Sequence, residues 1–261
     1  MKYFIVDAFT DTLFKGNPAG VCILEDELDV ITMQNIAAEN NLSETAFAFK
    51  KGDNYSLRWF TPITEIDLCG HATLGTAYVI SNFIDTSAVE MRFETKSGML
   101  TVIKNDDLFE LDFPSHKAGK CEVTKLMEQS IGCPVNEAYV SRDLMLVLDD
   151  EQQVLNLTPD LSLIAQIAEH GVIVTAKGES VDFVSRFFAP NVGVNEDPVT
   201  GSIHTTLIPF WAQRLTKKNL ISLQLSKRSG TLYCEDCGDR VKIAGKAVLY
   251  LKGELFIRSA C

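Results

Sequence analysis

An internal repeat is the strongest constraint on how this chain folds. RWFTP at residues 58–62 is answered by RFFAP at residues 186–190, and the seventh residue after each proline is Cys69 or Asp197. The offset is 128 in both places (190 − 62 and 197 − 69). Further matches follow in the same order, such as KSGML and RSGTL, at residues 96–100 and 228–232. Repeated sequence units fold as repeated structural units, so we expect two similar halves.

Each half combines helix-like and strand-like segments. Residues 30–40 and 160–169 place apolar side chains at helical spacing. Residues 72–83 and 203–215 are hydrophobic on nearly all sides, which indicates helices enclosed by protein, and Pro209 is placed to kink the second. Runs rich in β-branched and aromatic residues indicate strands at residues 46–49, 56–60, 99–103, 183–188 and 248–251. We therefore predict an α/β (α+β) fold in which each half is a curved mixed sheet around a central buried helix.

Composition excludes several functional classes. The 261 residues carry a formal net charge of -11 without a Lys/Arg-rich cluster, so nucleic acid is not an expected partner. No window approaches the roughly 20 apolar residues of a membrane span, and the acidic N-terminal segment does not resemble a signal peptide. Seven cysteines without a regular framework indicate reduced thiols and a cytoplasmic protein.

Positions where the two copies differ are candidates for function. The stretch from Ile36 to Gly52 is about five residues longer than its counterpart from Ile167 to Gly178 (52 − 36 against 178 − 167). The extra residues surround Glu44, which lies between a helix and an apolar strand. Partial desolvation there would raise the pKa of the carboxyl toward that of a useful general base. The alternative is an ordinary solvated loop glutamate.

The starts of the two enclosed helices also differ. LCGHAT at residues 68–73 and EDPVTGS at residues 196–202 contain glycine and small residues, which leave backbone N–H groups free to bind a carboxylate or phosphate. Ordinary capping by Asp197 or Ser202 is the alternative. His71 is one of four histidines and the best placed to exchange protons near neutral pH. Structural roles suffice for the other three, His116, His170 and His204.

Four motifs together resemble the signature of the PhzF-like family of phenazine-biosynthesis proteins. They are GNPAGV, LSETAF, CGHAT and EDPVTGS, at residues 16–21, 42–47, 69–73 and 196–202. Their order and spacing match the family over most of the chain. Members of this family are similar in fold to diaminopimelate epimerase, with two pseudosymmetric halves and a cleft between them.

The resemblance implies a cofactor-independent isomerase that moves a proton on a small anionic substrate, with its active site in the interdomain cleft and no metal. Glu44 matches the family's acid/base glutamate, and His71, Asp197 and Ser202 match its other catalytic residues. Substrate-binding roles are implied for Asn17, Ser43, Cys69, Gly70, Thr200 and Gly201. The resemblance also makes a homodimer plausible.

It further implies that the last strand, at about residues 254–261, returns to the N-terminal half. Because PSHKAGK at residues 114–120 breaks the pattern, we place one half over residues 1–115 plus that strand and the other over residues 116–253.

A binding protein without catalytic activity is the main alternative, and other readings fit the sequence less well. A two-thiol racemase would need a second cysteine where this chain has Asp197 opposite Cys69. A Ser-His-Asp hydrolase lacks the Gly-x-Ser-x-Gly turn. The lone C-x-x-C at residues 234–237, placed near a hairpin turn, lacks the further ligands of a structural zinc site.

Overall fold

The computed structural model describes residues 1–257, which form two compact units. Unit 1 comprises residues 1–112 and the chain from Ala244 onward, and unit 2 comprises residues 113–243. The elements that begin in unit 1 are β1 (Lys2–Ala8), β2 (Asn17–Leu24), α1 (Val30–Asn40), β3 (Glu44–Lys51), β4 (Asn54–Phe60), β5 (Glu65–Ile66), α2 (Gly70–Val79), β6 (Glu90–Thr95), β7 (Gly98–Asn105), β8 (Leu108–Pro114) and β17 (Ala247–Glu254).

The remaining elements begin in unit 2. They are β9 (Gly119–Cys121), α3 (Lys125–Ile131), β10 (Glu137–Val140), β11 (Leu144–Val147), α4 (Glu151–Leu155), α5 (Leu161–Ile167), β12 (Val172–Lys177), β13 (Phe183–Phe188), α6 (His204–Leu215), β14 (Asn219–Gln224), β15 (Gly230–Asp236) and β16 (Arg240–Gly245). The mixed α/β fold predicted from the sequence is confirmed.

The two units repeat one order of strand pairing. In unit 1, β2 pairs parallel with β3, β3 antiparallel with β4, β4 parallel with β6, and β6 antiparallel with β7. In unit 2, β11, β12, β13, β14 and β15 follow the same sequence of parallel and antiparallel pairings. The repeat seen in the sequence therefore corresponds to a repeat in topology.

The arginines of the repeated RWFTP and RFFAP segments each form an ion pair with a glutamate of their own unit. Arg58 donates from Nε and Nη2 to the two carboxylate oxygens of Glu65, at 2.7 and 2.9 Å. Arg186 donates likewise to Glu196, at 2.7 and 3.1 Å. Such two-point pairs fix both position and orientation. These matching positions belong to the scaffold rather than to a site.

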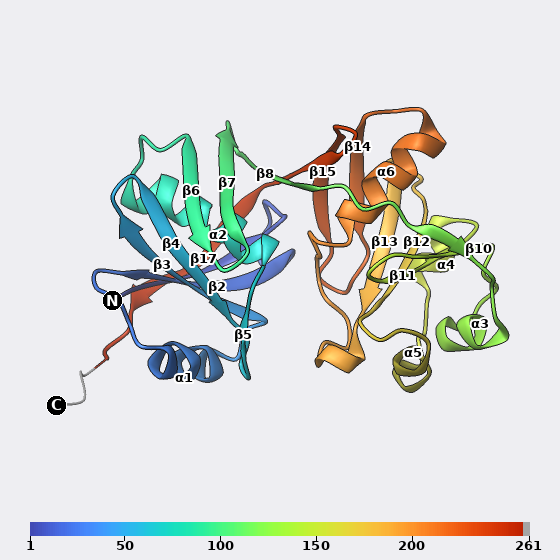
Figure 1. Cartoon of the computed structure of the whole chain (residues 1–261), viewed down its shortest axis with the longest axis horizontal. Helices are drawn as coiled ribbons and strands as arrows, with labels where there is room; N and C mark the ends of the chain where they lie inside the picture. Colours follow the sequence, from blue (N-terminus) through green and yellow to red (C-terminus); the bar gives the residue numbers. More distant parts are fainter. Residues whose placement is uncertain (258–261) are drawn as a thin grey trace. The chain divides into compact units, whose positions relative to one another are not determined.

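In unit 1, side chains alternate between two apolar layers because successive strand residues point to opposite faces. Tyr3 and Cys22 pack with Met33 of α1 on one face. Phe4 and Val21, their neighbours in sequence, pack on the other face with Val79 of α2. Figure 1 shows α1 outside the strands of this unit and α2 among them.

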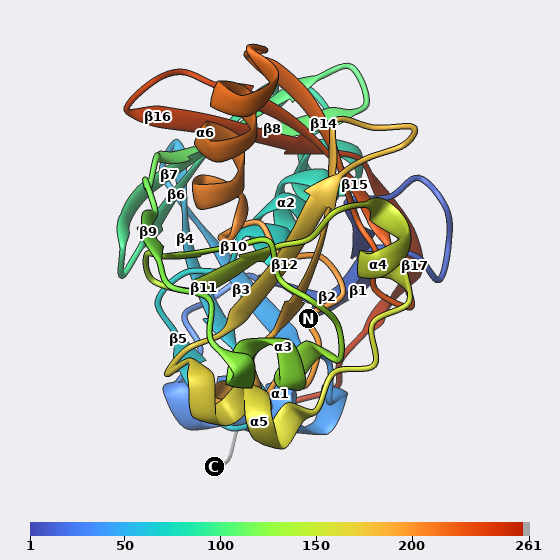
Figure 2. The ribbon, with the colours of Figure 1, turned by 90° about the vertical axis from the view of Figure 1, so that its right-hand side faces the viewer.

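Unit 2 uses the same alternation. Val172 and Val174 of β12 pack toward the side on which Ile131, Val154 and Ile164 of the small helices gather. The small helices α3 and α5 lie side by side (Figure 2). Thr175, on the opposite face, accepts a hydrogen bond of 3.0 Å from the indole N–H of Trp211 in α6.

Pro209 lies inside α6, as the sequence predicts. Proline has no N–H, so the carbonyl of Thr205, four residues earlier, loses its helical partner. The N–H of His116 donates to that carbonyl instead, at 2.9 Å. The helix interruption therefore anchors the segment that connects β8 to β9.

Some predicted boundaries differ from the structure. The helix predicted at residues 72–83 begins at Gly70, and Ile80–Ile84 form a π-helical turn. The last strand is β17, at residues 247–254 rather than 254–261, because its apolar run pairs with β1. The chain accordingly returns to unit 1 at Ala244. Residues 258–261 lie outside the described residues. Within residues 1–257, the helices are too short or too polar to cross a membrane.

Candidate active site

The end of α1 and the start of β3 position Glu44. Asn41 ends the helix in the left-handed conformation, with φ 49°, which asparagine tolerates better than most residues. The side chain of Asn40 donates to the hydroxyl of Thr45, at 3.2 Å. Glu44 is the first residue of β3, and Ser43 immediately precedes it. The start of β3 therefore places a carboxylate at the edge of the sheet. The extra residues of this half lie in α1 and β3, which are longer than α5 and β12, and not in the connection at residues 41–43.

A tight turn brings Asn17 to the same edge. Gly16 has φ +65°, and a Cβ there would lie 2.1 Å from the carbonyl oxygen of Ala8, so a side chain does not fit. Asn17 then begins β2, whose Ala19 pairs with Glu44 in the parallel ladder. Because parallel strands start at the same edge of a sheet, Asn17 and Glu44 lie on the same side of unit 1.

Helix α2 supplies Cys69, Gly70 and His71. Cys69 is the residue before the first turn and makes no side-chain capping bond. The buried threonines of the helix bond internally; for example, Thr76 donates to the carbonyl of Ala72, at 2.7 Å. The helix can therefore be buried with its threonine hydroxyls hydrogen-bonded. Its first backbone N–H groups are not capped by a side chain.

These residues converge on the ring of His71. Its Nε2 lies 3.1 Å from Oε2 of Glu44, and the two side chains are only 7% and 15% exposed. On the other side of the ring, Nδ1 lies 3.3 Å from the amide nitrogen of Asn17 and 3.5 Å from the sulfur of Cys69. Nδ1 therefore has Asn17 and Cys69 as neighbours, while Nε2 faces Glu44.

The contact between Glu44 and His71 is close but not saturated. Oε2 and Nε2 are buried, and within the described residues neither makes a hydrogen bond of good geometry, although they are 3.1 Å apart. Buried polar atoms are usually hydrogen-bonded. The pair therefore retains bonding capacity for a reacting molecule or water.

The charge of Glu44 also affects the ring electrostatically. Burial lowers the pKa of His71, but the neighbouring acidic groups of Cys69 and Glu44 outweigh burial and hold this pKa well above 6.5. Burial raises the pKa of the Cys69 thiol, against the opposing effect of His71. Because that thiol stays protonated near neutral pH, Glu44 is the group that favours a charged imidazole there.

In unit 2, Asp197 and Thr200 are held together ahead of α6. The hydroxyl of Thr200 donates to Oδ2 of Asp197, at 2.5 Å. Gln224 accepts from the N–H of Thr200, at 2.8 Å, and donates to the carbonyl of Asp197, also at 2.8 Å. Gly201 is buried in the turn that follows. This carboxylate is thus engaged by its own loop. It does not cap α6, whose N-cap residue is Ile203 and has no side-chain capping bond.

Ser202 contacts a residue that the sequence did not single out. Nη2 of Arg142 donates to the Ser202 hydroxyl, at 3.0 Å. Arg142 lies between β10 and β11, 60 positions away in the sequence. No motif marks it, and the folded chain brings it to Ser202 from a distant part of the sequence.

The other three histidines have structural partners. His204 is fully buried; its Nδ1 donates to the carbonyl of Thr200, at 2.8 Å, and its Nε2 lies 2.9 Å from the Ser222 hydroxyl. His116 contacts Thr205, and Nδ1 of His170 contacts Asp143.

Glu44, Cys69 and His71 are also of the types that bind transition metals. One ligand atom from each lies within 4.8 Å of the others, and three protein ligands are the number found at catalytic zinc sites. A soft divalent cation could be held there. In the C-x-x-C segment, Cys234 is buried in β15 and Cys237 is exposed just after it.

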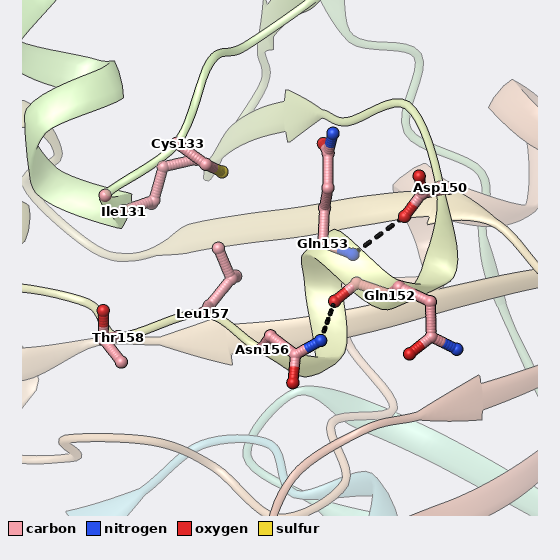
Figure 3. Close-up of a pocket in the computed structure, with 9 residues that line it drawn as sticks. Ile131, Cys133, Asp150, Gln152, Gln153, Asn156, Leu157 and Thr158 are labelled. Carbon is pink, nitrogen blue, oxygen red and sulfur yellow. Dashed lines mark hydrogen bonds between the residues drawn. The ribbon is translucent and has the colours of Figure 1, made fainter.

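Two pockets of unit 2 lie apart from the predicted catalytic residues. One, of about 350 Å³, is lined by Cys133, Asp150, Gln153, Asn156 and neighbouring residues (Figure 3). Its polar side chains mostly serve the short helix α4; for example, Asp150 accepts from the N–H of Gln153, at 2.8 Å. The other, of about 630 Å³, lies beside α6 and β10, next to Phe210 and Arg214. Neither is lined by Asp197, Thr200 or Ser202.

Comparison with known proteins identifies relatives along the whole chain. A family model described as phenazine biosynthesis-like protein matches residues 6–253. An uncharacterized isomerase of Pseudomonas aeruginosa is 48% identical, over 98% of this chain and 99% of its own length. The phenazine biosynthesis-like domain-containing protein of Homo sapiens is 41% identical, over 98% of this chain and 99% of its own.

Solved structures agree. A crystal structure of a PhzF-family protein from Enterococcus faecalis has a TM-score of 0.96 and 49% identity, covering 98% of this chain and 99% of that one. A predicted epimerase from Pseudomonas aeruginosa has a TM-score of 0.73 at 16% identity, over 98% of this chain and 99% of that one, and so shares the fold alone.

Proposed function

Because the chain belongs to the phenazine biosynthesis-like family and is an isomerase, we propose that it moves a proton on a small carboxylate-bearing substrate. In this proposal Glu44 is the general acid/base and His71 its partner. The reaction needs no cofactor, because both proton-transfer groups belong to the chain.

The contact between Glu44 and His71 carries the proposal. A general base must reach the substrate and change its protonation state near working pH. Glu44 is 15% exposed, so its carboxylate is desolvated but still accessible, and its partner His71 is buried. The unsaturated geometry of the pair leaves capacity for bonding to a reacting group.

The chemistry follows from these groups. A C–H bond next to a carbonyl, imine or alkene is weakly acidic, and a positioned base contributes about 10²- to 10⁴-fold to its cleavage. Glu44 takes the proton from one carbon and returns it to another. The charged ring of His71 stabilises the carboxylate before the transfer and steadies the negative charge that develops on the substrate. The uncapped N–H groups at Gly70 are suited to hold a substrate carboxylate.

We further propose that residues of unit 2 contact substrate. Asp197 and Ser202 would assist proton transfer or orient the substrate, while Thr200 and Gly201 shape the loop that carries them. Asn17, Ser43 and Cys69 would complete the substrate contacts of unit 1. A cytoplasmic location and a homodimer remain predictions from the sequence.

Solvent-deuterium uptake tests the proposal. The protein is incubated in D2O with a panel of cyclic carboxylates and amino acids, and incorporation is followed by mass spectrometry. We expect at least one compound to exchange, and we expect Glu44→Gln to slow that exchange by about 10²-fold or more. Glu39→Gln, a change at an exposed glutamate of α1, is the matched control and should exchange at the wild-type rate.

The outcomes separate the proposal from its alternative. Exchange that survives Glu44→Gln at the wild-type rate would remove Glu44 from the mechanism. A protein that binds compounds of the panel but exchanges none would instead be a catalytically idle member of the fold.

A further inference from the structure

We propose that Arg142 binds the carboxylate of the substrate and is a specificity-determining residue of this isomerase. The proposal rests on the proposed function, because it assigns Arg142 to the site that contains Ser202. It adds a residue that lies outside all four sequence motifs.

Arg142 is half-exposed, yet its position is fixed. Its side chain is 48% exposed, while that of Asp143 is 4% exposed. Nε and Nη2 of Arg142 donate to the same oxygen of Asp143, Oδ2, at 3.0 and 2.9 Å. Nη2 also donates to the hydroxyl of Ser202, at 3.0 Å. An exposed arginine normally samples many conformations, whereas this one is held on two sides.

Asp143 is the anchor of this arrangement. A buried carboxylate is costly unless it is paired, and Asp143 has two basic partners. Its Oδ2 binds Arg142, and its Oδ1 lies 2.5 Å from Nδ1 of His170. His170 therefore orients the carboxylate, and the carboxylate orients the guanidinium. Such support keeps a recognition group in place before the ligand arrives.

The guanidinium of Arg142 keeps donors for a ligand. Of its five N–H groups, those on Nη1 make no bond within the described residues. Arg186 differs, because its Nη1 donates to the carbonyls of Val154 and Leu157, at 3.3 and 3.2 Å. Arg142 engages one oxygen only, and its partner Ser202 is neutral. It is therefore equipped to bind a further anion.

A carboxylate is the anion that this geometry favours. Nη1 of the guanidinium and the Ser202 hydroxyl beside it are the donors that remain for the two oxygens of a carboxylate. The site lies two residues before α6, where the helix dipole also favours negative charge.

Binding of a simple carboxylate tests the inference without knowledge of the substrate. Benzoate is titrated into the full-length protein, with benzamide as the neutral probe, and the arginine Nε–H signals are followed by NMR. We expect benzoate, and not benzamide, to shift the Arg142 signal saturably. Arg142→Met should weaken benzoate binding by about 10- to 100-fold, since it removes a charge-assisted hydrogen bond. Arg142→Lys, which keeps the charge but not the fork, should fall between.

Arg92→Met is the matched control. Arg92 is an exposed arginine of β6 that pairs with nearby Glu90, so its loss should leave benzoate binding unchanged. Asp143→Asn tests the anchor and should weaken binding with Arg142 still present. If it does not fold, the Arg142 variants carry the test alone.

Two results would overturn the inference: equal benzoate binding by Arg142→Met and Arg92→Met, or a shift caused by benzamide as well as benzoate. For a substrate that exchanges deuterium, Arg142→Met should raise KM more than it lowers kcat, which a purely structural role would not produce. Failure of the Glu44→Gln test would contradict the proton-transfer proposal and leave these binding results unaffected, so the two can fail separately.

Discussion

The enclosed helices of the two units each begin with a buried histidine, yet the two rings are in opposite electrostatic situations. His71 of α2 faces the carboxylate of Glu44, and its pKa is held well above 6.5. His204 of α6 has a carbonyl and a hydroxyl as partners, and burial lowers its pKa to about 4, against the hydrogen bond with Thr200. Burial disfavours the charged form of both rings, so the group next to each ring determines whether its pKa is raised or lowered.

The difference shows how a duplicated scaffold specialises. Both rings are buried. Both ring nitrogens of His204 have hydrogen-bond partners, whereas the pair of His71 and Glu44 makes no hydrogen bond of good geometry within the described residues. Glu44, the first residue of β3, supplies the carboxylate beside His71. One enclosed helix therefore carries a structural histidine, and the other carries a histidine that faces a carboxylate.

The sharpest test of this contrast exchanges each histidine for asparagine. His71→Asn should slow deuterium exchange by about 10²-fold or more, because a proton-transfer partner is lost. His204→Asn should mainly reduce the free energy of unfolding, by about 1–3 kcal/mol for each buried partner left unsatisfied. Exchange rates and urea denaturation measure the two effects. Equal effects of both changes on exchange would abolish the distinction.

The pH dependence of stability should differ in sign between the two rings. The raised pKa of His71 means that its pairing stabilises the fold fully below pH 6.5 and that this stabilisation is lost as pH rises through the folded-state value. His204 stays neutral when folded, so stability is full above pH 6.5 and falls by about 3 kcal/mol as pH drops to about 4.

Urea denaturation across this range, on wild type, Glu44→Gln and His204→Asn, measures these terms. Glu44→Gln should remove the alkaline loss, and His204→Asn the acidic loss. A pH profile that neither change alters would contradict the assignment.

Arg58 and Arg186, which occupy matching positions in the two units, allow a direct comparison of scaffold stability. Arg58→Lys and Arg186→Lys should each destabilise their unit, because lysine cannot make the two-point contact with glutamate. Arg186 should cost more, by about 1 kcal/mol, since it also donates to the carbonyls of Val154 and Leu157, at 3.3 and 3.2 Å. Thermal unfolding of both variants provides the measurement, and a larger loss at Arg58 would be the contrary result.

Replacement of Cys69 should have the smallest effect. Its thiol is buried and has a raised pKa, and the corresponding position in the other copy is Asp197. We expect Cys69→Ala to leave deuterium exchange within about tenfold of wild type, less than the loss of a general base. A loss as large as that of Glu44→Gln would instead point to thiol chemistry.

Much of the fold follows from the sequence, because its causes are local or repeated. The helical period of residues 30–40 predicts α1 with the observed bounds, and the matching Arg58 and Arg186 predict a shared scaffold. The sequence does not predict the π-helical turn at residues 80–84. A segment that is apolar on all sides has no polar face whose spacing would reveal a change in helical period. The position of the last strand was wrong because it depends on pairing with β1 across the whole chain.

The residues of the candidate site likewise differ in how far the sequence predicts them. Glu44, Cys69 and His71 were found from local contrasts between the copies, and the structure brings them together. The contact of Asn17 with the ring depends on the parallel register of β2 and β3, which the motif alone does not reveal. Arg142 was missed, because its contact with Ser202 arises only from the folded strand order.

NMR titration of the four histidines, in wild type and in Glu44→Gln, tests most directly whether Glu44 and His71 form one proton-transfer unit. The account predicts that the midpoint of His71 lies well above 6.5 in the wild type and falls in the variant, while that of His204 stays at about 4 in both. A midpoint of His71 that lies below 6.5 in the wild type and does not move in Glu44→Gln would contradict it.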